Sequence, residues 1–203
     1  MKEKLTNYAF IDSQNLNLGV RSLGWKIDYS KLRLYLKNKY NVTQAFMFIG
    51  LVANNQELYT ELQKAGFILV FKPTIRYFEN GKQTVKGNVD SELVLHAAAI
   101  QYSNYNKAVI ISGDGDFACL LDYLAQNNKL LKVLTPSSKY SQLLKPFTDY
   151  IVRIDLLKKS LSYQKSQHRR SVKTLGLSGN GDTLNILKSS KNVNKQKHNN
   201  YDK

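Results

Sequence analysis

The chain has 203 residues, room for one medium-sized domain or for one domain with a tail. Lys and Arg number 30 against 15 Asp and Glu, so the formal net charge is +15, which favours a polyanionic partner, nucleic acid before an anionic membrane. No apolar run approaches the roughly 20 residues of a membrane-spanning helix, which excludes a transmembrane protein. The single cysteine, Cys119, excludes a disulfide framework and a cysteine-based zinc site, and is expected to be a buried thiol. No apolar segment follows the basic N-terminus, so a cytoplasmic protein is expected.

The first three quarters of the chain alternate short apolar runs with longer amphipathic ones. In chain order this pattern predicts a strand over residues 8–12, a helix over 28–40, a strand over 44–50, a helix over 54–65 and a strand over 67–72. Asn80-Gly81 lies between two β-prone runs and predicts a hairpin over 74–85. The pattern then predicts a helix over 89–102, a strand over 107–112, a helix over 116–126, a strand over 130–134, a short helix within 136–146, a strand over 150–154 and a short helix over 155–161.

This alternation predicts an α/β fold with a mostly parallel central sheet of about five or six strands and helices on both faces. Charge distinguishes this part of the chain from its C-terminal quarter. Residues 1–157 hold 19 basic and 13 acidic residues, whereas residues 158–203 hold 11 basic and 2 acidic ones. From about residue 165 the chain is rich in Lys, Ser, Asn and Gln. We therefore expect a folded domain over 1–157 and a basic, largely disordered tail over 158–203.

Carboxylates follow two of the predicted strands. Asp12 ends the first strand, and Asp114 and Asp116 follow the strand over 107–112, while Asp90 opens a predicted helix. Open parallel sheets bind ligands at the C-terminal ends of their strands. Carboxylates gathered there repel one another unless a cation lies among them. Because the candidate ligands are all oxygens, they favour Mg²⁺ or Mn²⁺ over zinc.

Each of these residues also has a simpler interpretation. A single Asp after a strand is more often a helix N-cap or a turn residue than a metal ligand, and Asp114-Gly115 is a common turn pair. Asp90 suits the first turn of a helix through the helix dipole alone. The joint occurrence of acidic residues at successive strand ends is what favours the metal site.

Three motifs, taken together, resemble those of the NYN domains, the LabA-like branch of the PIN-like nuclease superfamily. They are Tyr8-Ala-Phe-Ile-Asp12-Ser-Gln-Asn15-Leu, Lys86-Gly-Asn-Val-Asp90 and Ser112-Gly-Asp114-Gly-Asp116-Phe117. The resemblance covers roughly residues 5–157 and implies a Rossmann-like PIN fold and a metal-dependent endoribonuclease that uses Mg²⁺ or Mn²⁺. It also implies a site in which Asn15 and Ser112 accompany four metal-binding carboxylates, those of Asp12, Asp90, Asp114 and Asp116. RNA is then the expected partner, and a homodimer is a further expectation because PIN-like relatives often dimerise.

One position departs from the family's pattern. Many members carry another Asp six residues after the Asp of the Val-Asp pair, where this chain has His96. His96 is either a substitute ligand or phosphate contact, or a helix histidine packed among alanines, and the second interpretation is favoured. The departure supports an alternative function, a catalytically weak or inactive RNA-binding or adaptor module on the same fold. Toprim nucleases and haloacid-dehalogenase-type phosphatases are lesser alternatives, because each needs an acidic residue that the strand ends lack here.

Basic residues are candidate RNA contacts. Arg76 and Lys86 flank the predicted hairpin, and Arg169 and Arg170 lie in the basic tail. We expect them to contact the RNA backbone without selecting sequence, although charges in hairpins and tails are often only solvated. Trp25 is expected either to stack on a nucleotide or to pack in the core.

Overall fold

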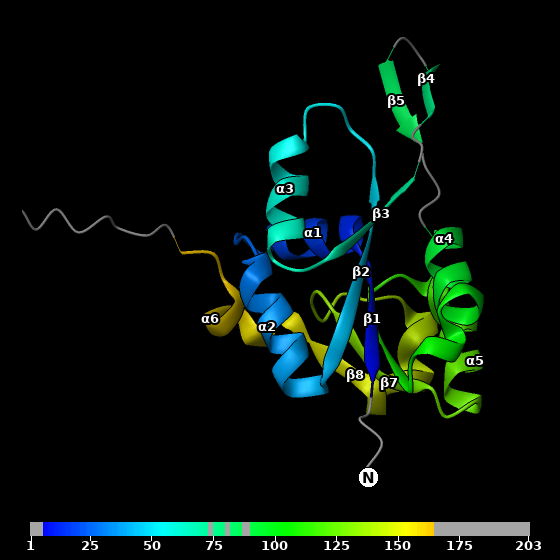
Figure 1. Ribbon diagram of the computed structural model, residues 1–203. Coiled ribbons are helices and arrows are strands. Elements are labelled where there is room, and N and C mark those ends of the chain that lie inside the picture. Colours follow the sequence, from blue (N-terminus) through cyan, green and yellow to red (C-terminus); the bar gives the residue numbers. More distant parts are fainter. Residues whose placement is uncertain (1–5, 73–74, 80–81, 87–89, 165–203) are drawn as a thin grey trace, which may run out of the picture. The chain divides into compact units, whose positions relative to one another are not determined.

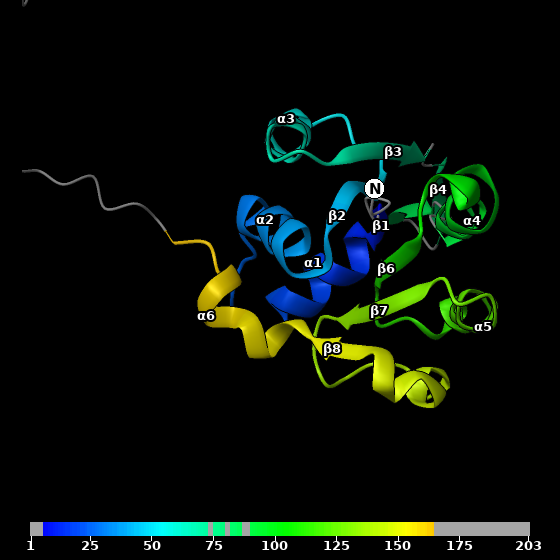
Figure 2. The same ribbon diagram turned by 60° about the horizontal axis from the view of Figure 1, so that its bottom comes forward.

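The computed structural model describes residues 6–72, 75–79, 82–86 and 90–164, and the side chains of residues 6–72 and 90–164 (Figure 1). Its central strands are β1 (Asn7–Asp12), β2 (Val42–Gly50), β3 (Ile68–Lys72), β6 (Lys107–Ile111), β7 (Leu130–Thr135) and β8 (Ile151–Arg153). They form one six-stranded sheet in the order β3-β2-β1-β6-β7-β8, which can be followed in Figure 2. Every neighbouring pair is parallel. The α/β fold with a central parallel sheet, as predicted, is therefore confirmed.

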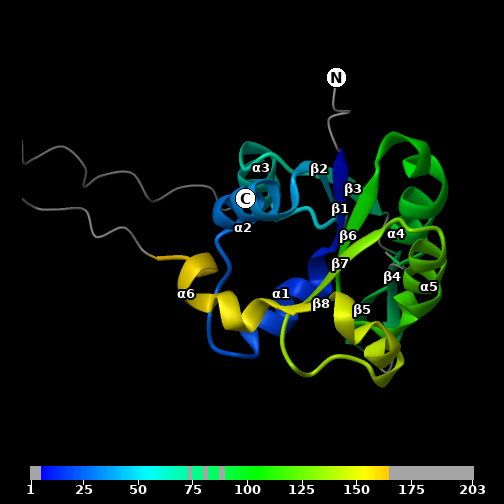
Figure 3. The same ribbon diagram turned by 90° about the horizontal axis from the view of Figure 1, so that it is seen from below.

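Helices cover both faces of this sheet, as Figure 3 shows. On one face lie α1 (Ser13–Arg21), α2 (Tyr29–Tyr40), α3 (Gln56–Lys64) and α6 (Lys158–Leu161), and on the other lie α4 (Asp90–Leu95) and α5 (Ala118–Gln126). Shorter segments are the π-helical turn η1 (His96–Ile100) and the 3-10 segments η2 (Tyr102–Asn104), η3 (Gly115–Phe117), η4 (Gln142–Tyr150) and η5 (Ile154–Leu157). Within the described residues, no helix has the length and apolar composition needed to cross a bilayer.

The two faces of the sheet have separate hydrophobic cores. Side chains of successive strand residues point to opposite faces, so Phe10 and Ile11 of β1 belong to different cores. Ile11 packs with Leu32 of α2, whereas Phe10 stacks on Phe46 of β2 with ring centroids 5.6 Å apart. All six residues of β1 are buried, which explains why this strand is read from the sequence as a continuous apolar run.

Two local features refine the sequence prediction. The predicted hairpin is present, because β4 (Ile75–Glu79) and β5 (Lys82–Lys86) pair antiparallel with Glu79 opposite Lys82. Helix α1 was missed, since its apolar signal is short: Leu16 and Val20 are buried four residues apart, but Leu18 between them is 56% exposed. Its N-cap is Asp12, one of the carboxylates that the sequence predicts for the metal site.

The described chain continues beyond residue 157 as ordered structure. Leu161 of α6 is 1% exposed and belongs to the core on the α1–α3 side. The backbone N–H of Asp28 donates to the carbonyl of Leu161 over 2.8 Å, and that of Tyr163 donates to the carbonyl of Lys26 over 2.9 Å. Residues 161–163 therefore lie against the segment that leads into α2. The extent of the basic tail stays a prediction, because residues 165–203 lie outside the described part of the chain.

Candidate active site

The site is built where the chain leaves β1 and enters α1. Asp12 is the last residue of β1 and the N-cap of α1, with its Oδ1 atom accepting a hydrogen bond of 3.1 Å from the backbone N–H of Asn15. An Asp in this position satisfies one of the unpaired N–H groups of the first helical turn. The Asp12 side chain is only 6% exposed, so this carboxyl group is held between strand and helix. The simpler interpretation as an N-cap is therefore also correct.

A second set of polar groups follows the neighbouring strand β6 and lies at the same edge of the sheet as Asp12. In the parallel register Ile11 lies opposite Ile111, so Asp12 and Ser112 follow their strands side by side. The Ser112 hydroxyl donates to Oδ2 of Asp12 over 3.2 Å and accepts from the backbone N–H of Asp114 over 3.1 Å. Ser112 thus links the carboxylate of Asp12 to the backbone of Asp114. The two strands meet at the point where the strand order reverses direction along the chain. Open α/β sheets bind ligands at such a switch point.

Two further hydrogen bonds fix the loop after β6. Oδ1 of Asn15 accepts from the backbone N–H of Gly113 over 2.8 Å, which ties the first turn of α1 to this loop. Oδ1 of Asp114 accepts from the backbone N–H of Asp116 over 3.1 Å, so Asp114 caps the turn that opens η3. A Cβ on Gly115 would collide with the Ser141 hydroxyl, so a larger residue between the two carboxylates would have to displace the Ser141 side chain. The turn therefore presents Asp114 and Asp116 in a fixed arrangement.

The charges at this edge of the sheet act on one another. Burial raises the pKa of Asp12 above its ordinary value, and the charge of Asp90 raises it further, against the hydrogen bonds that lower it. Burial also raises the pKa of Asp90, as do the charges of Asp114 and Asp116, whereas Lys72 at the end of β3 lowers it. Asp90 thus lies close enough to interact with each of the other three predicted carboxylates. Lys72 is a residue that the sequence reading missed, and its only signal was a lysine ending an apolar strand.

The donor chemistry of this cluster fits a hard cation. Its ligands would be carboxylate oxygens, and a bound cation would relieve the mutual repulsion between the charges of Asp12 and Asp90. Among the described residues, no three His, Cys, Asp or Glu side chains are grouped closely enough to hold one ion together. Mg²⁺ is usually bound through one or two carboxylates and keeps several of its waters, so a pair of these side chains suffices for it.

The structure brings six of the predicted residues into this cluster: Asp12, Asn15, Asp90, Ser112, Asp114 and Asp116. Arg76 and Lys86 fall in β4 and β5, whose backbone is described but whose side chains are not. Arg169 and Arg170 lie outside the described residues. The predicted contacts of these four basic residues with RNA therefore stay predictions.

Three other residues of the sequence analysis are now placed. The ring of His96 lies 5.3 Å from that of Phe48 and 6.1 Å from that of Phe46, so it packs on the core of the α4 side. Trp25 is 7% exposed and packs in the other core, which leaves no face for a nucleotide. Cys119 is exposed, so the expectation of a buried thiol was wrong. It stands on the solvent side of α5, one residue before the buried Leu120.

Comparison with known proteins agrees with this geometry. The family model of the NYN domain matches residues 8–155, a span that contains every residue of the cluster. A crystal structure of a protein of unknown function, VPA0982, from Vibrio parahaemolyticus RIMD 2210633 is similar with a TM-score of 0.68 and 23% identity, over 80% of this chain and 99% of that one. No curated protein matches the chain. Because the family model covers most of the described fold and all of the carboxylates, the chain belongs to the NYN domain family.

Proposed function

We propose that this protein is a metal-dependent endoribonuclease whose site is the cluster at the ends of β1 and β6. The observation that carries the proposal is the convergence of four carboxylates from three segments, with the pKa of Asp90 raised by burial and by the charges of Asp114 and Asp116. Carboxylates that raise one another's pKa in a cluster at a strand edge are typical of a site that binds a cation. Membership of a nuclease-type family and the net charge of +15 support RNA as the substrate.

The roles follow from the contacts. Asp12, Asp90, Asp114 and Asp116 would supply the carboxylate ligands of Mg²⁺ or Mn²⁺, with a pair of them on one ion. The ion would supply charge stabilisation to the phosphodiester when bound. Ser112 and Asn15 position this set, because one bridges Asp12 to the Asp114 backbone and the other anchors the Gly113 backbone to α1. Hydrolysis adds water across the P–O3′ bond, leaving a 5′-phosphate and a 3′-hydroxyl.

Basic residues outside the cluster would raise affinity for the RNA backbone. Arg76, Lys86, Arg169 and Arg170 are proposed for this role from their place in the sequence. A domain over 1–157 followed by a basic tail over 158–203, of which residues 161–163 pack on that domain, belongs to the same proposal. So do a cytoplasmic location and a homodimer. An RNA-binding module without turnover is the alternative, and a cleavage experiment separates it from the nuclease.

The test is cleavage of labelled RNAs and DNAs by the full chain with Mn²⁺, with Mg²⁺ or with EDTA. Asp114→Asn is the test variant, and Asp149→Asn, an exposed carboxylate in η4, is the control for loss of one charge. We expect metal-dependent cleavage of RNA that Asp149→Asn retains and Asp114→Asn loses. RNA binding without cleavage by wild type under any metal would overturn the nuclease assignment in favour of the binding module.

A further inference from the structure

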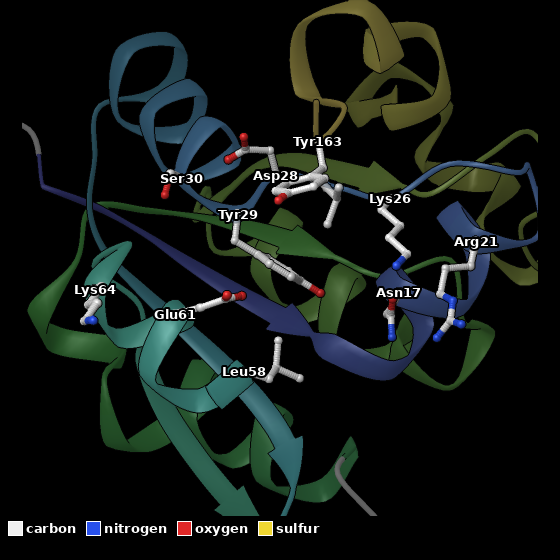
Figure 4. A pocket seen from close by; sticks show the side chains of 11 residues that line it. Asn17, Arg21, Lys26, Asp28, Tyr29, Ser30, Leu58, Glu61, Lys64 and Tyr163 are labelled. Carbon is white, nitrogen blue, oxygen red and sulfur yellow. The ribbon is translucent and has the colours of Figure 1, made fainter. Parts of the chain in front are cut away.

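A second concave site lies on the opposite side of helix α1 from the carboxylates. The pocket has a volume of ≈ 830 Å³ and is bounded by α1, by the segment that leads into α2, by the first turn of α2, by α3 and by Tyr163 (Figure 4). Binding pockets for small organic ligands commonly have volumes of roughly 300–1,000 Å³. None of the residues assigned to the carboxylate cluster lines it.

Helical spacing explains how one helix serves both sites. Asn15 and Gly19, four residues apart, face β6 and β7: Asn15 bonds to Gly113, and a Cβ on Gly19 would meet Pro136 at 2.5 Å. Asn17 and Arg21, also four residues apart, line the pocket. The two pairs are offset by two residues, about 200° around the helix, so they lie on opposite faces. Arg21 is about 9 Å along the helix axis from Asn15 at 1.5 Å per residue.

The cations of the pocket have no ionic partner in the described part of the chain. Arg21, Lys26 and Lys64 line the pocket, and none of them forms an ion pair or a side-chain hydrogen bond there. The carboxylate of Asp28 is already engaged, because it accepts from the backbone N–H of Lys31 over 3.1 Å and lies 3.8 Å from the Lys31 ammonium. Three uncommitted positive charges around a concavity favour an anionic ligand.

An aromatic residue lies at the centre of these charges. Figure 4 shows Asn17, Arg21 and Lys26 gathered on one side of Tyr29, with Glu61 of α3 on the other side. The ring of Tyr29 is held by edge-to-face packing on Phe67, with centroids 6.3 Å apart and an interplanar angle of 87°. Burial raises the pKa of Tyr29 while the charge of Arg21 lowers it, which agrees with their closeness. The pocket therefore combines a cationic side, a fixed aromatic ring and a carboxylate.

We propose that this pocket binds one nucleotide of the RNA, a short distance along the RNA strand from the phosphate at the carboxylate cluster. This inference rests on the proposed function. Arg21 and Lys26 take the phosphate, and the base lies against Tyr29. Glu61 would repel a phosphate, so it faces the base, where a carboxylate accepts hydrogen bonds from an exocyclic amino group. Tyr163 also lines the pocket. Contacts at a second nucleotide fix which phosphate reaches the carboxylates.

The binding test needs no cleavage. Binding of a fluorescently labelled oligoadenylate to the full chain is measured in EDTA, with AMP and inorganic phosphate as competitors. Arg21→Gln and Lys26→Gln are compared with Lys37→Gln, an exposed lysine of α2 outside the pocket that loses the same charge. Tyr29→Phe keeps the packing on Phe67 and serves as a folding control for Tyr29→Leu.

We expect at least a fivefold loss of affinity for Arg21→Gln, for Lys26→Gln and for Tyr29→Leu, and less than a twofold loss for Lys37→Gln. AMP should compete better than inorganic phosphate. Equal losses in Arg21→Gln and Lys37→Gln, or equal competition by phosphate and AMP, would overturn the inference.

A cleavage comparison separates this inference from the proposed function. A dinucleoside monophosphate carries a single phosphate, which cannot lie at both sites, so wild type and Arg21→Gln should cleave it equally. Longer RNA should be cleaved more slowly by Arg21→Gln. Absence of cleavage in wild type, together with the expected binding losses, would overturn the nuclease and leave the pocket standing. Equal cleavage of long RNA by both proteins, with equal binding, would overturn the pocket and leave the nuclease standing.

Discussion

The side-chain oxygen of Asn15 accepts a 2.8 Å hydrogen bond from the backbone N–H of Gly113, and so connects the first turn of α1 to the loop that carries Asp114. The two residues are 98 positions apart in the chain. The bond holds the segments that follow β1 and β6 against each other at the site. The positions of the carboxylates therefore depend on Asn15, which is uncharged.

Asn15→Ala removes this connection. We expect a loss of about 1 kcal/mol in the free energy of unfolding, because one part-buried hydrogen bond is lost. RNA cleavage should fall by about 10- to 100-fold, the usual effect of removing a group that orients metal ligands. Gln14→Ala, an exposed neighbour on the same turn, is the control for both measurements. Unchanged cleavage by Asn15→Ala would show that the loop after β6 keeps its place without this bond.

Asp12→Asn should raise thermal stability at neutral pH while abolishing activity. The pKa of Asp12 is raised in the folded protein, chiefly by burial, so its ionised form is penalised there. Stability from this group is fully present below its unfolded pKa and is lost as the pH rises through the folded value. In EDTA, Tm of Asp12→Asn should therefore exceed that of wild type at pH 7, and the difference should shrink as the pH falls towards 4. A variant less stable than wild type at pH 7 would show that the ionised Asp12 carboxylate stabilises the folded protein, contrary to this prediction.

Mn²⁺ should raise Tm of the wild-type protein, because a cation that binds only the folded state stabilises it by mass action. EDTA should reverse the rise. Asp90→Asn and Asp114→Asn should each reduce it, whereas Asp149→Asn should keep it. Differential scanning fluorimetry over a Mn²⁺ titration measures all four proteins. An equal rise in every variant would place the bound metal outside the cluster.

His96→Leu should retain both stability and cleavage. The Nδ1 atom of His96 is buried and has no hydrogen-bond partner among the described residues, while its ring packs on Phe46 and Phe48. Replacing an unpaired buried polar group by an apolar one of similar size is close to neutral or stabilising. Tm and the Mn²⁺-induced rise in Tm are the measurements. Loss of that rise in His96→Leu would make His96 a participant in metal binding.

Gly19→Ala should destabilise the protein, although alanine is the better helix former by about 1 kcal/mol. The added Cβ would lie 2.5 Å from Cβ of Pro136, so α1 must move away from the loop after β7. Overpacking of this kind costs about 1–3 kcal/mol. Chemical denaturation measures the change, with Leu18→Ala on the exposed side of α1 as the control. A Gly19→Ala variant more stable than wild type would mean that the loop after β7 moves to accommodate the added Cβ without loss of stability.

The elements that are long or strongly apolar could be predicted from the sequence. The run Tyr8–Asp12 identified β1, and Asn80-Gly81 identified the hairpin, because both patterns have few alternative conformations. Helix α1 could not be identified, because Gly19 and the exposed Leu18 interrupt its apolar spacing. Because α1 was not predicted, the pocket could not be predicted either: Asn17 and Arg21 lie on one face only when this segment is helical.

The α/β class, the three carboxylates after strands, the carboxylate that opens a helix and the excess of positive charge follow from the sequence alone, because each depends on local composition and order along the chain. The tertiary structure decided which distant groups meet. Ser112 reaches Asp12 because β1 and β6 are parallel neighbours, and Lys72 comes close to Asp90 because α4 begins near the end of β3. Burial at that edge raises the pKa of Asp12 and of Asp90, and burial is a property of packing that no single segment contains.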